Sequence, residues 1–269
     1  MNEPFIRKTE RMLFIKKWQD KIPGLIAGFT TRNGGVSEAP FDSLNIGLHV
    51  NDEKQHVLTN RKLFVKDLSF SMNDWVSGEQ VHQTKIKKLG EADKGSGAAS
   101  NADSIPNTDG LITNKKGILC TAYFADCVPL FFLDPVTEYI GIAHAGWKGT
   151  VNGMASKMAA AFKENGVLAE NLHVIIGPCI SSAYYEVDNH VVRHIMPKYR
   201  ENCVTPRGNN QFLLDLKQLN VDILLQAGVL RNNIDVTNYC TFKDRALFFS
   251  HRRDEGKTGR MAGFIGFSL

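Results

Sequence analysis

Short apolar runs separated by turn residues recur along the chain and predict β-strands. Their approximate positions are residues 12–18, 25–31, 75–77, 117–123, 128–133, 139–143, 172–176, 234–239 and 261–267. Three of these runs, at 117–123, 128–133 and 139–143, follow one another closely, and a turn at 134–137 joins the last two. Because consecutive strands are usually neighbours, we expect these three to lie side by side in one sheet.

Apolar residues at helical spacing predict four helices. The first runs to about residue 66 with Asn51 or Asp52 as its N-cap, and the second covers 150–164 and ends at Asn165-Gly166. The other two are expected at 189–196 and 215–227. Helices mixed with neighbouring strand pairs favour an α+β (mixed α/β) fold over a regular doubly wound sheet.

A polar segment at 91–107 is rich in Gly, Ala, Ser, Asn and Asp. Such a composition is typical either of a linker between domains or of a long surface loop. Nothing after it resembles the start of a new folding unit, and 269 residues can form one large core. We therefore predict a single domain over residues 1–269.

Composition narrows the classes of partner. The 32 basic and 28 acidic residues give a formal charge of +4, which is too balanced for a nucleic-acid surface but leaves an anionic small molecule open. The apolar runs are far shorter than a membrane span, and the N-terminal residues lack the apolar core of a signal peptide, so we expect no membrane contact and a cytoplasmic location. Five scattered cysteines predict reduced thiols. Assembly into a homo-oligomer is left open.

Cys127 and His144 each lie where an apolar, strand-like run changes to small and polar residues, and His82 is the natural third member of the set. Strand ends give a side chain rigid support, and Cys and His are suited to zinc binding or to nucleophilic chemistry. Each residue alone is more often structural. Asp126 before the cysteine and Pro129 after it argue against an ordinary core strand.

Three classes of site remain open. The first is a catalytic zinc site of His82, Cys127 and His144 with a free fourth position, and the second is a hydrolase or deamidase in which Cys127 attacks and His144 favours the thiolate. The third is a non-enzymatic domain that binds metal. Zinc is favoured because two histidines and a cysteine exceed what a thiol nucleophile requires. Copper is the weaker alternative, since multicopper sites need clustered imidazoles and the chain has no His-X-His pair.

Basic residues recur near these candidates and predict phosphate contacts only weakly. Arg32 lies in a glycine-containing loop, Lys148 follows the His144 segment, and Arg252 lies near the C-terminus. A guanidinium matches phosphate in fork geometry, although a solvated charge is the more common role of any one such residue. Tyr184 or Tyr185 could stack on a base, although a packed aromatic is the more common role.

Several motifs occur in the order seen in one protein family. They are Thr31–Ser37, Asn45–Val50, Gln80–His82, Ala125–Pro129, His144–Gly149 and Gly177–Ile180. From about Phe14 to the C-terminus the chain closely resembles the laccase-domain family of purine nucleoside phosphorylases, whose members were long described as polyphenol oxidases. This resemblance implies a single domain of layered mixed sheets flanked by helices, similar to the fold of Cys/His toxin deamidases.

The resemblance also implies a zinc site at His82, Cys127 and His144. It implies phosphorolysis of adenosine, inosine and methylthioadenosine to a free base and a sugar 1-phosphate, together with adenosine deamination. Some relatives are linked instead to editing of peptidoglycan precursors. Asn45, within the second motif, is a further weak candidate for substrate contact.

The predicted partners are thus purine nucleosides and phosphate. Zinc would polarise an oxygen, either of water for attack at purine C6 or of phosphate near the ribose. Arg32 and Arg252 are the weak candidates for holding that phosphate. Lys148 stands where many relatives have Arg, and its point charge cannot form a two-pronged contact.

Overall fold

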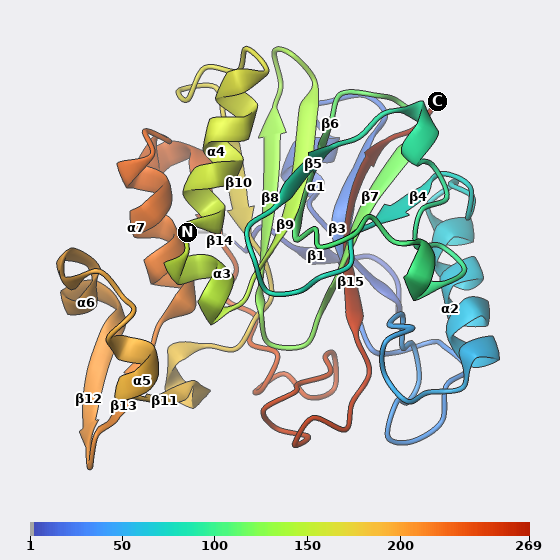
Figure 1. Cartoon of the computed structure of the whole chain (residues 1–269). Coiled ribbons are helices and arrows are strands. Elements are labelled where there is room, and N and C mark those ends of the chain that lie inside the picture. Colours follow the sequence, from blue (N-terminus) through green and yellow to red (C-terminus); the bar gives the residue numbers. More distant parts are fainter. Residues whose placement is uncertain (1–2) are drawn as a thin grey trace.

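The computed structural model describes residues 3–269 and contains two six-stranded mixed sheets (Figure 1). The strands of the first sheet, in spatial order, are β1 (Ile6–Arg7), β2 (Met12–Phe14), β3 (Leu25–Thr30), β15 (Met261–Phe267), β7 (Ile118–Phe124) and β4 (Trp75–Ser77). Those of the second are β14 (Ile234–Val236), β10 (His173–Ile176), β8 (Val128–Asp134), β9 (Tyr139–Ala145), β6 (Gly110–Thr113) and β5 (Ile86–Lys88). The predicted α+β class is confirmed.

A small third sheet contains β11 (Glu186–Asp188), β13 (Gln211–Leu214) and β12 (Val204–Gly208). The helices are α1 (Lys16–Gln19), α2 (Lys54–Asp67), α3 (Trp147–Val151), α4 (Met154–Glu164), α5 (Asn189–Val192), α6 (Pro197–Cys203) and α7 (Leu216–Gln226). Among residues 3–269, none of these helices has the length and apolar character needed to cross a membrane.

The two large sheets pack face to face, and the alternation of side chains along each strand produces the layers. On β8, Phe131 points into the core between the sheets, where it joins Phe124 and Ile265 of the first sheet. Its neighbour Phe132 points the other way and packs with Phe162 of α4. Helices α3, α4 and α7 thus cover the second sheet, while α2 covers the first (Figure 1).

The expectation that the strands at 117–123, 128–133 and 139–143 are neighbours is wrong in one respect. β8 and β9 pair antiparallel as expected, but β7 lies in the first sheet between β15 and β4. The chain crosses from one sheet to the other at 125–127, where Asp126 adopts a left-handed φ of 87° that no continuous strand would contain. Pro129, which argued against an ordinary core strand, lies inside the predicted strand β8 opposite His144.

Other differences have local causes. The strand expected at 12–18 ends at Phe14, and α1 follows it. The helix expected at 150–164 is two helices, because Gly153 adopts a left-handed φ of 81° between α3 and α4. The first predicted helix begins later, with Glu53 at its N-cap. Asp52 precedes the cap: its Oδ1 accepts from the Glu53 N–H, and its Oδ2 accepts hydrogen bonds from Ser37 and Asn45.

Some boundaries and elements could not be read from the apolar pattern. The helix expected at 189–196 is shortened to α5. The segment at 91–107 contains two short 3₁₀ helices, and the strands β5, β6 and β11 to β13 and helix α6 were not predicted. These elements are short or strongly exposed, so their sequences carry little periodicity.

Candidate metal centre

His82, Cys127 and His144 meet at one point, although they come from three separate segments. One potential ligand atom from each lies within 4.8 Å of the others. The Cys127 Sγ lies 4.0 Å from the His82 Nε2, and the two imidazole rings are nearly perpendicular with centroids 4.8 Å apart. The structure therefore brings together the three residues singled out in the sequence, while their role as ligands remains a prediction.

The crossing between the sheets explains why they meet. His82 follows β4 of the first sheet, Cys127 lies where the chain enters β8, and His144 lies on the neighbouring strand β9. Gly146 lets the three approach, because a Cβ at this position would lie 2.9 Å from the Cys127 Sγ and 3.1 Å from the His82 Cδ2. A side chain here would push two of the three donors aside.

Asp109 organises the cluster from behind. Its buried carboxylate accepts a hydrogen bond from the His144 Nδ1 at 2.9 Å and from the backbone N–H groups of three successive residues, Val81, His82 and Gln83. With Nδ1 bound to a carboxylate, the Nε2 of His144 is left for the cluster. Sequence reasoning missed Asp109; its only indication was a carboxylate directly before an apolar run.

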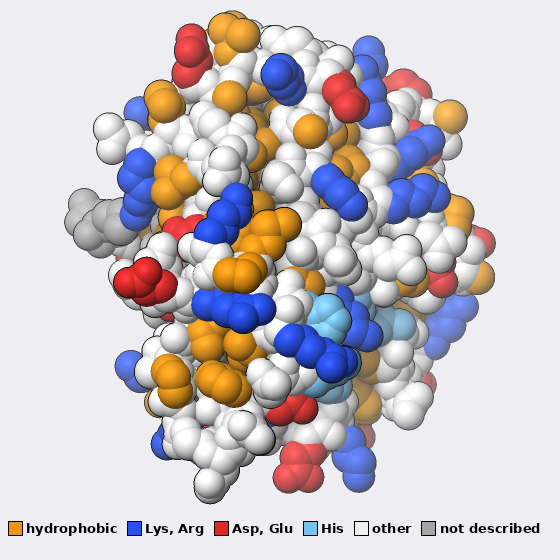
Figure 2. Space-filling view, turned by 60° about the vertical axis from the view of Figure 1, so that its left-hand side comes forward, with side chains coloured by type: hydrophobic (Ala, Val, Ile, Leu, Met, Phe, Trp, Pro, Cys, Tyr) orange, Lys and Arg blue, Asp and Glu red, His pale blue; other side chains and the backbone are white. Residues whose placement is uncertain are grey.

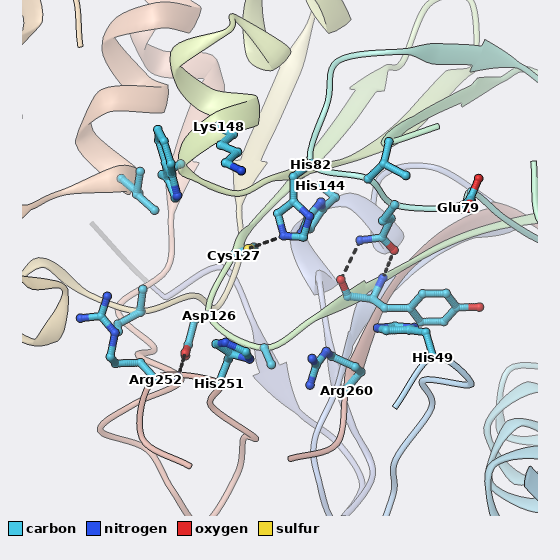
Figure 3. A pocket seen from close by; sticks show the side chains of 18 of the residues that line it. His49, Glu79, His82, Asp126, Cys127, His144, Lys148, His251, Arg252 and Arg260 are labelled. Carbon is cyan, nitrogen blue, oxygen red and sulfur yellow. Dashed lines mark hydrogen bonds between the residues drawn. The ribbon is translucent and has the colours of Figure 1, made fainter. Parts of the chain in front are cut away.

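The loop that carries His82 is also tied to β7. Gln80 donates from its Nε2 to the Tyr123 carbonyl at 2.8 Å, and its Oε1 accepts from the Tyr123 N–H at 2.6 Å (Figure 3). The amide side chain thus replaces a strand neighbour at the end of β7. This contact accounts for the glutamine in the Gln80-Val81-His82 motif.

The Cys127 thiol and the His144 imidazole shift each other's pKa in opposite directions. Burial raises the pKa of the Cys127 thiol, but His144 and His82 lower it by more, so the net shift is downward. Burial lowers the pKa of His144, whereas Cys127 and Asp109 raise it by more. In the metal-free protein a thiolate is therefore favoured beside a protonated imidazole. The thiolate is the form of cysteine that binds metals and attacks electrophiles.

The cluster lies against a cavity of about 680 Å³, which is large enough for a nucleoside and an anion. His144 is 3% exposed, while His82 is exposed and open to this space. The cavity is lined by the cationic residues Lys148, Arg252 and Arg260, the imidazoles of His49 and His251, the aromatic rings of Tyr123, Trp147 and Tyr185, and the carboxylates of Glu79 and Asp126. Histidine side chains beside Lys and Arg are also visible on the face in Figure 2.

The weaker candidates from the sequence divide into two groups. Lys148 and Arg252 line the cavity. Arg32 does not: its guanidinium is paired with the Asp42 carboxylate at 3.2 Å and lies over the Phe249 ring. Asn45 is fully buried and is not part of the lining either, so it acts at most through neighbouring residues. Tyr185 lines the cavity, whereas Tyr184 stacks on Phe242.

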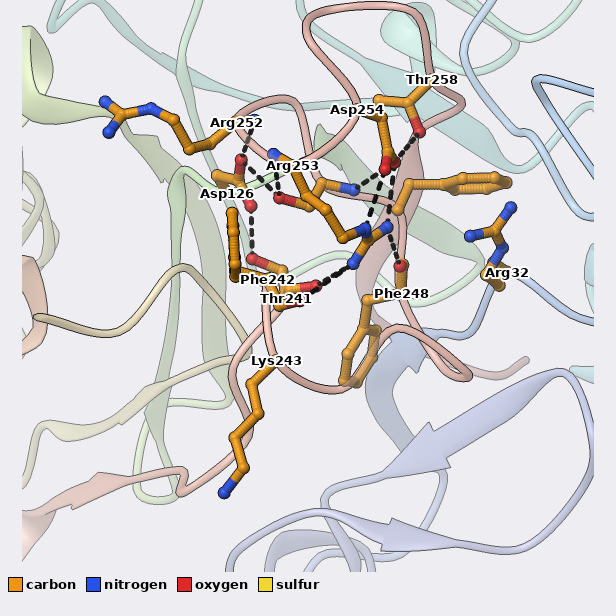
Figure 4. Close-up of polar contacts among 12 residues, drawn as sticks. Arg32, Asp126, Thr241, Phe242, Lys243, Phe248, Arg252, Arg253, Asp254 and Thr258 are labelled. Atoms are coloured by element: carbon orange, nitrogen blue, oxygen red, sulfur yellow. Dashed lines mark hydrogen bonds and ion pairs between the residues drawn. The ribbon is translucent and has the colours of Figure 1, made fainter. Parts of the chain in front are cut away.

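Asp126 anchors the irregular segment between β14 and β15 next to the cluster. Its carboxylate accepts hydrogen bonds from the Thr241 hydroxyl, the Ser250 hydroxyl and the Arg252 N–H at 2.6, 3.0 and 2.7 Å (Figure 4). Arg253 holds the same segment from inside through carbonyls of three residues, Thr241, Phe242 and Phe248. The residue before Cys127 therefore also sets the position of Arg252.

Comparison with known proteins identifies the family. A family model described as "Multi-copper polyphenol oxidoreductase laccase" matches residues 26–268. The chain belongs to this laccase family. It is 41% identical to "Purine nucleoside phosphorylase YlmD" of Bacillus subtilis and 43% identical to the protein of the same name from Geobacillus stearothermophilus, in each case over 98% of this chain and 97% of the relative.

Solved structures agree with this laccase-family assignment. The crystal structure of YlmD from Geobacillus stearothermophilus superposes with a TM-score of 0.95 at 39% identity and covers 100% of both chains. A hypothetical protein YfiH from Bacillus licheniformis gives the same TM-score at 42% identity, covering 99% of this chain and 100% of the other.

The donor set of this laccase-family chain fits a single transition-metal ion. Two imidazoles and a thiolate are ligands that zinc prefers, with bond lengths of about 2.0 and 2.3 Å, so donors to one ion lie within about 4 Å of one another. The ligand atoms of His82, Cys127 and His144 lie up to 4.8 Å apart, so they would need to move only slightly closer together to bind one ion. Within residues 3–269 no second group of three or more His, Cys, Asp or Glu side chains is arranged for a metal.

Proposed function

We propose that this protein is a zinc-dependent purine nucleoside phosphorylase formed by the whole chain as one catalytic domain. Its substrates would be adenosine, inosine and methylthioadenosine, and its second activity adenosine deamination. The observation that carries the proposal is the convergence of His82, Cys127 and His144 beside a large cavity with cationic walls. The names of the two YlmD relatives support the same activity.

Zinc is the metal we propose for the site. A mononuclear copper site with two histidines and one cysteine usually adds a weak axial methionine, and the described residues that line the cavity include none. His82, Cys127 and His144 would hold the ion and leave one position open to the cavity. When bound, zinc would supply a Lewis acid for the oxygen of water or of phosphate.

The lining supports a nucleoside together with an anion. Tyr185 and Trp147 offer aromatic surfaces on which a purine could lie, and Lys148 and Arg252 are the substrate contacts we propose at that end. Phosphorolysis breaks the C1′–N9 bond and forms a bond from C1′ to a phosphate oxygen, and the departing purine keeps the bond electrons and takes up a proton. Cationic walls favour both the phosphate and the charge that develops on the base.

A second candidate function has one specific observation in its favour. The imidazole of His144 lies beside the Cys127 thiol, and its Nδ1 is hydrogen-bonded to the Asp109 carboxylate at 2.9 Å. This is the arrangement of a cysteine nucleophile with its base and orienting acid. It would suit a Cys/His amidase-type hydrolase, or the editing of a peptidoglycan precursor.

The test is to incubate zinc-loaded protein with adenosine, with and without phosphate, and to separate the products. We expect inosine in both samples and adenine with ribose 1-phosphate only when phosphate is present. Cys127→Ala should abolish both reactions. If adenosine, inosine and methylthioadenosine all stay intact at high protein concentration, the proposal fails. A covalent adduct on Cys127, seen by intact-mass measurement with amide or muropeptide substrates, would then favour the second candidate.

A further inference from the structure

The cations around the cavity differ in how they are neutralised. Arg252 is exposed, lies over the Tyr185 ring and donates from its Nη1 to the Glu186 carbonyl at 2.8 Å. Lys148 is exposed and lies over Trp147. Arg260 is set deeper, and no carboxylate among residues 3–269 lies within ion-pair distance of it. Water can solvate the first two, whereas Arg260 is partly removed from water without a counter-ion.

Arg260 is held in a defined position by the Asn45–Val50 motif. Its backbone N–H donates to the Asn45 Oδ1 at 2.8 Å. A Cβ on Gly47 would lie 2.8 Å from the Arg260 Cγ and 3.3 Å from the His49 Cε1, so glycine is needed for both side chains to pack here. The motif therefore builds a support for Arg260, and the buried Asn45 acts through it.

The guanidinium retains free donors that face the cavity. Its Nη1 is used by the carbonyls of Thr258 and Gly259, at 2.9 and 3.0 Å. Its Nε and Nη2 bind no protein acceptor among the described residues, and the group lies between His251 and His49 on the cavity side in Figure 3. Burial lowers the pKa of Arg260, while the charges of Cys127 and Asp126 oppose this shift. The guanidinium is therefore partly desolvated, and it lines the same cavity as His82, Cys127 and His144.

A partly desolvated cation with two adjacent unused donors is the usual partner of an oxyanion. We propose that the Nε and Nη2 of Arg260, with the His49 imidazole beside them, form the subsite that binds inorganic phosphate. This inference rests on the proposed function only in naming phosphate as the co-substrate. It places phosphate at the His49 end of the cavity and leaves the end at Trp147 and Tyr185 to the purine.

The test measures phosphate binding directly, by isothermal titration of the zinc-loaded protein with inorganic phosphate and no nucleoside. Arg260→Gln should weaken binding at least about tenfold, in line with the loss of a charged hydrogen bond. Arg260→Lys should restore only part of it, since the fork is lost. Gly47→Ala should weaken it as well, by displacing Arg260. Arg245→Gln removes the same charge from an exposed loop outside the cavity and should leave binding unchanged.

Kinetics give the second readout. In Arg260→Gln the KM for phosphate should rise about tenfold or more, while the KM for the nucleoside changes less than about twofold. Zinc content equal to that of the parent protein checks that each variant is folded. Unchanged phosphate binding in Arg260→Gln would overturn the subsite, and so would an equal loss in Arg252→Gln. The subsite would also be overturned if the protein bound adenosine 5′-monophosphate but not free phosphate.

The two proposals fail in different ways. If phosphate binds through Arg260 but no nucleoside is cleaved, the subsite stands and the phosphorylase assignment fails. If nucleosides are cleaved and the phosphate KM is the same in Arg260→Gln, the phosphorylase assignment stands and the subsite fails.

Discussion

Asp109 and His144 form a buried pair in which the imidazole Nδ1 lies 2.9 Å from the carboxylate Oδ1. The same carboxylate collects three backbone N–H groups from the His82 loop. One side chain therefore orients two of the three proposed ligands, which makes it the most informative position to alter without touching a ligand.

Replacing this carboxylate by an amide should weaken metal binding. In Asp109→Asn the side chain cannot accept from all four donors, so the His144 ring and the His82 loop lose their fixed orientation. Losing such a partner typically lowers metal affinity about 10- to 100-fold. Competition with a chromogenic chelator measures the zinc affinity. Asp103→Asn, at an exposed position, is the matched control and should bind zinc like the parent protein. Equal affinities in the two variants would contradict the orienting role.

Metal content tests the ligand assignment itself. We expect about one zinc per chain, because three donors converge from separate segments and leave one position open. The zinc should be lost or much weakened in Cys127→Ala, His82→Ala and His144→Ala. Elemental analysis of protein purified without added metal measures the stoichiometry. Active protein without any transition metal would refute the zinc site and favour Cys127 as a nucleophile.

The close approach at Gly146 gives a prediction that spares every polar group. In Gly146→Ala the new methyl would meet the Cys127 Sγ at 2.9 Å and the His82 Cδ2 at 3.1 Å, so the donors must separate. We expect zinc binding and activity to fall sharply, with a smaller loss of thermal stability. Gly90→Ala is the control, since its added Cβ meets nothing within 4 Å. Normal zinc binding in Gly146→Ala would show that the cluster is looser than described.

The lowered pKa of Cys127 predicts how the metal-free protein reacts with iodoacetamide. An ordinary thiol, with a pKa of about 8.5, becomes more than about tenfold more reactive between pH 7 and pH 8.5 as the thiolate forms. Cys127 should be largely ionised already at pH 7, so its rate should rise much less over this range. Burial raises the pKa of Cys120 and Cys179 to about 12, which keeps these thiols unreactive.

Mass spectrometry after timed alkylation locates the modified residue, and Cys127→Ser provides the background. Added zinc should suppress the reaction by binding the thiolate. A rate that climbs with pH as steeply as that of a free thiol would show that the imidazoles do not stabilise the thiolate.

Local sequence was enough to indicate the fold class and to single out side chains that the fold brings together, since Cys127 and His144 each stand where an apolar strand changes character. It could not show that β7 and β8 belong to different sheets, because the left-handed turn at Asp126 has no apolar pattern of its own. Asp109 was missed for the same reason: a carboxylate before a four-residue strand looks like any turn residue. Its role depends on segments that become neighbours only in the folded chain.

The arginines show the same limit more clearly. Arg32 and Arg260 both lie near glycines in the sequence. Because both carry the same guanidinium group, its two-pronged geometry does not show which of them binds an anion. Arg32 is neutralised by Asp42, ten residues away, whereas Arg260 is positioned by Asn45, 215 residues away. Which guanidinium remains available to a ligand is decided by these partners and so cannot be deduced from local spacing.

The crossing of the chain between the two sheets has a mechanical consequence. His82 and Cys127 lie on connections that leave the first sheet, and His144 belongs to the second. An ion bound by all three would close a 45-residue loop between His82 and Cys127 and would cross-link the two sheets. Saturation at 100 times the dissociation constant would add about 2.7 kcal/mol to the free energy of unfolding. Removal of the ion by a chelator should therefore weaken the packing between the two sheets before it affects the helices on their outer faces.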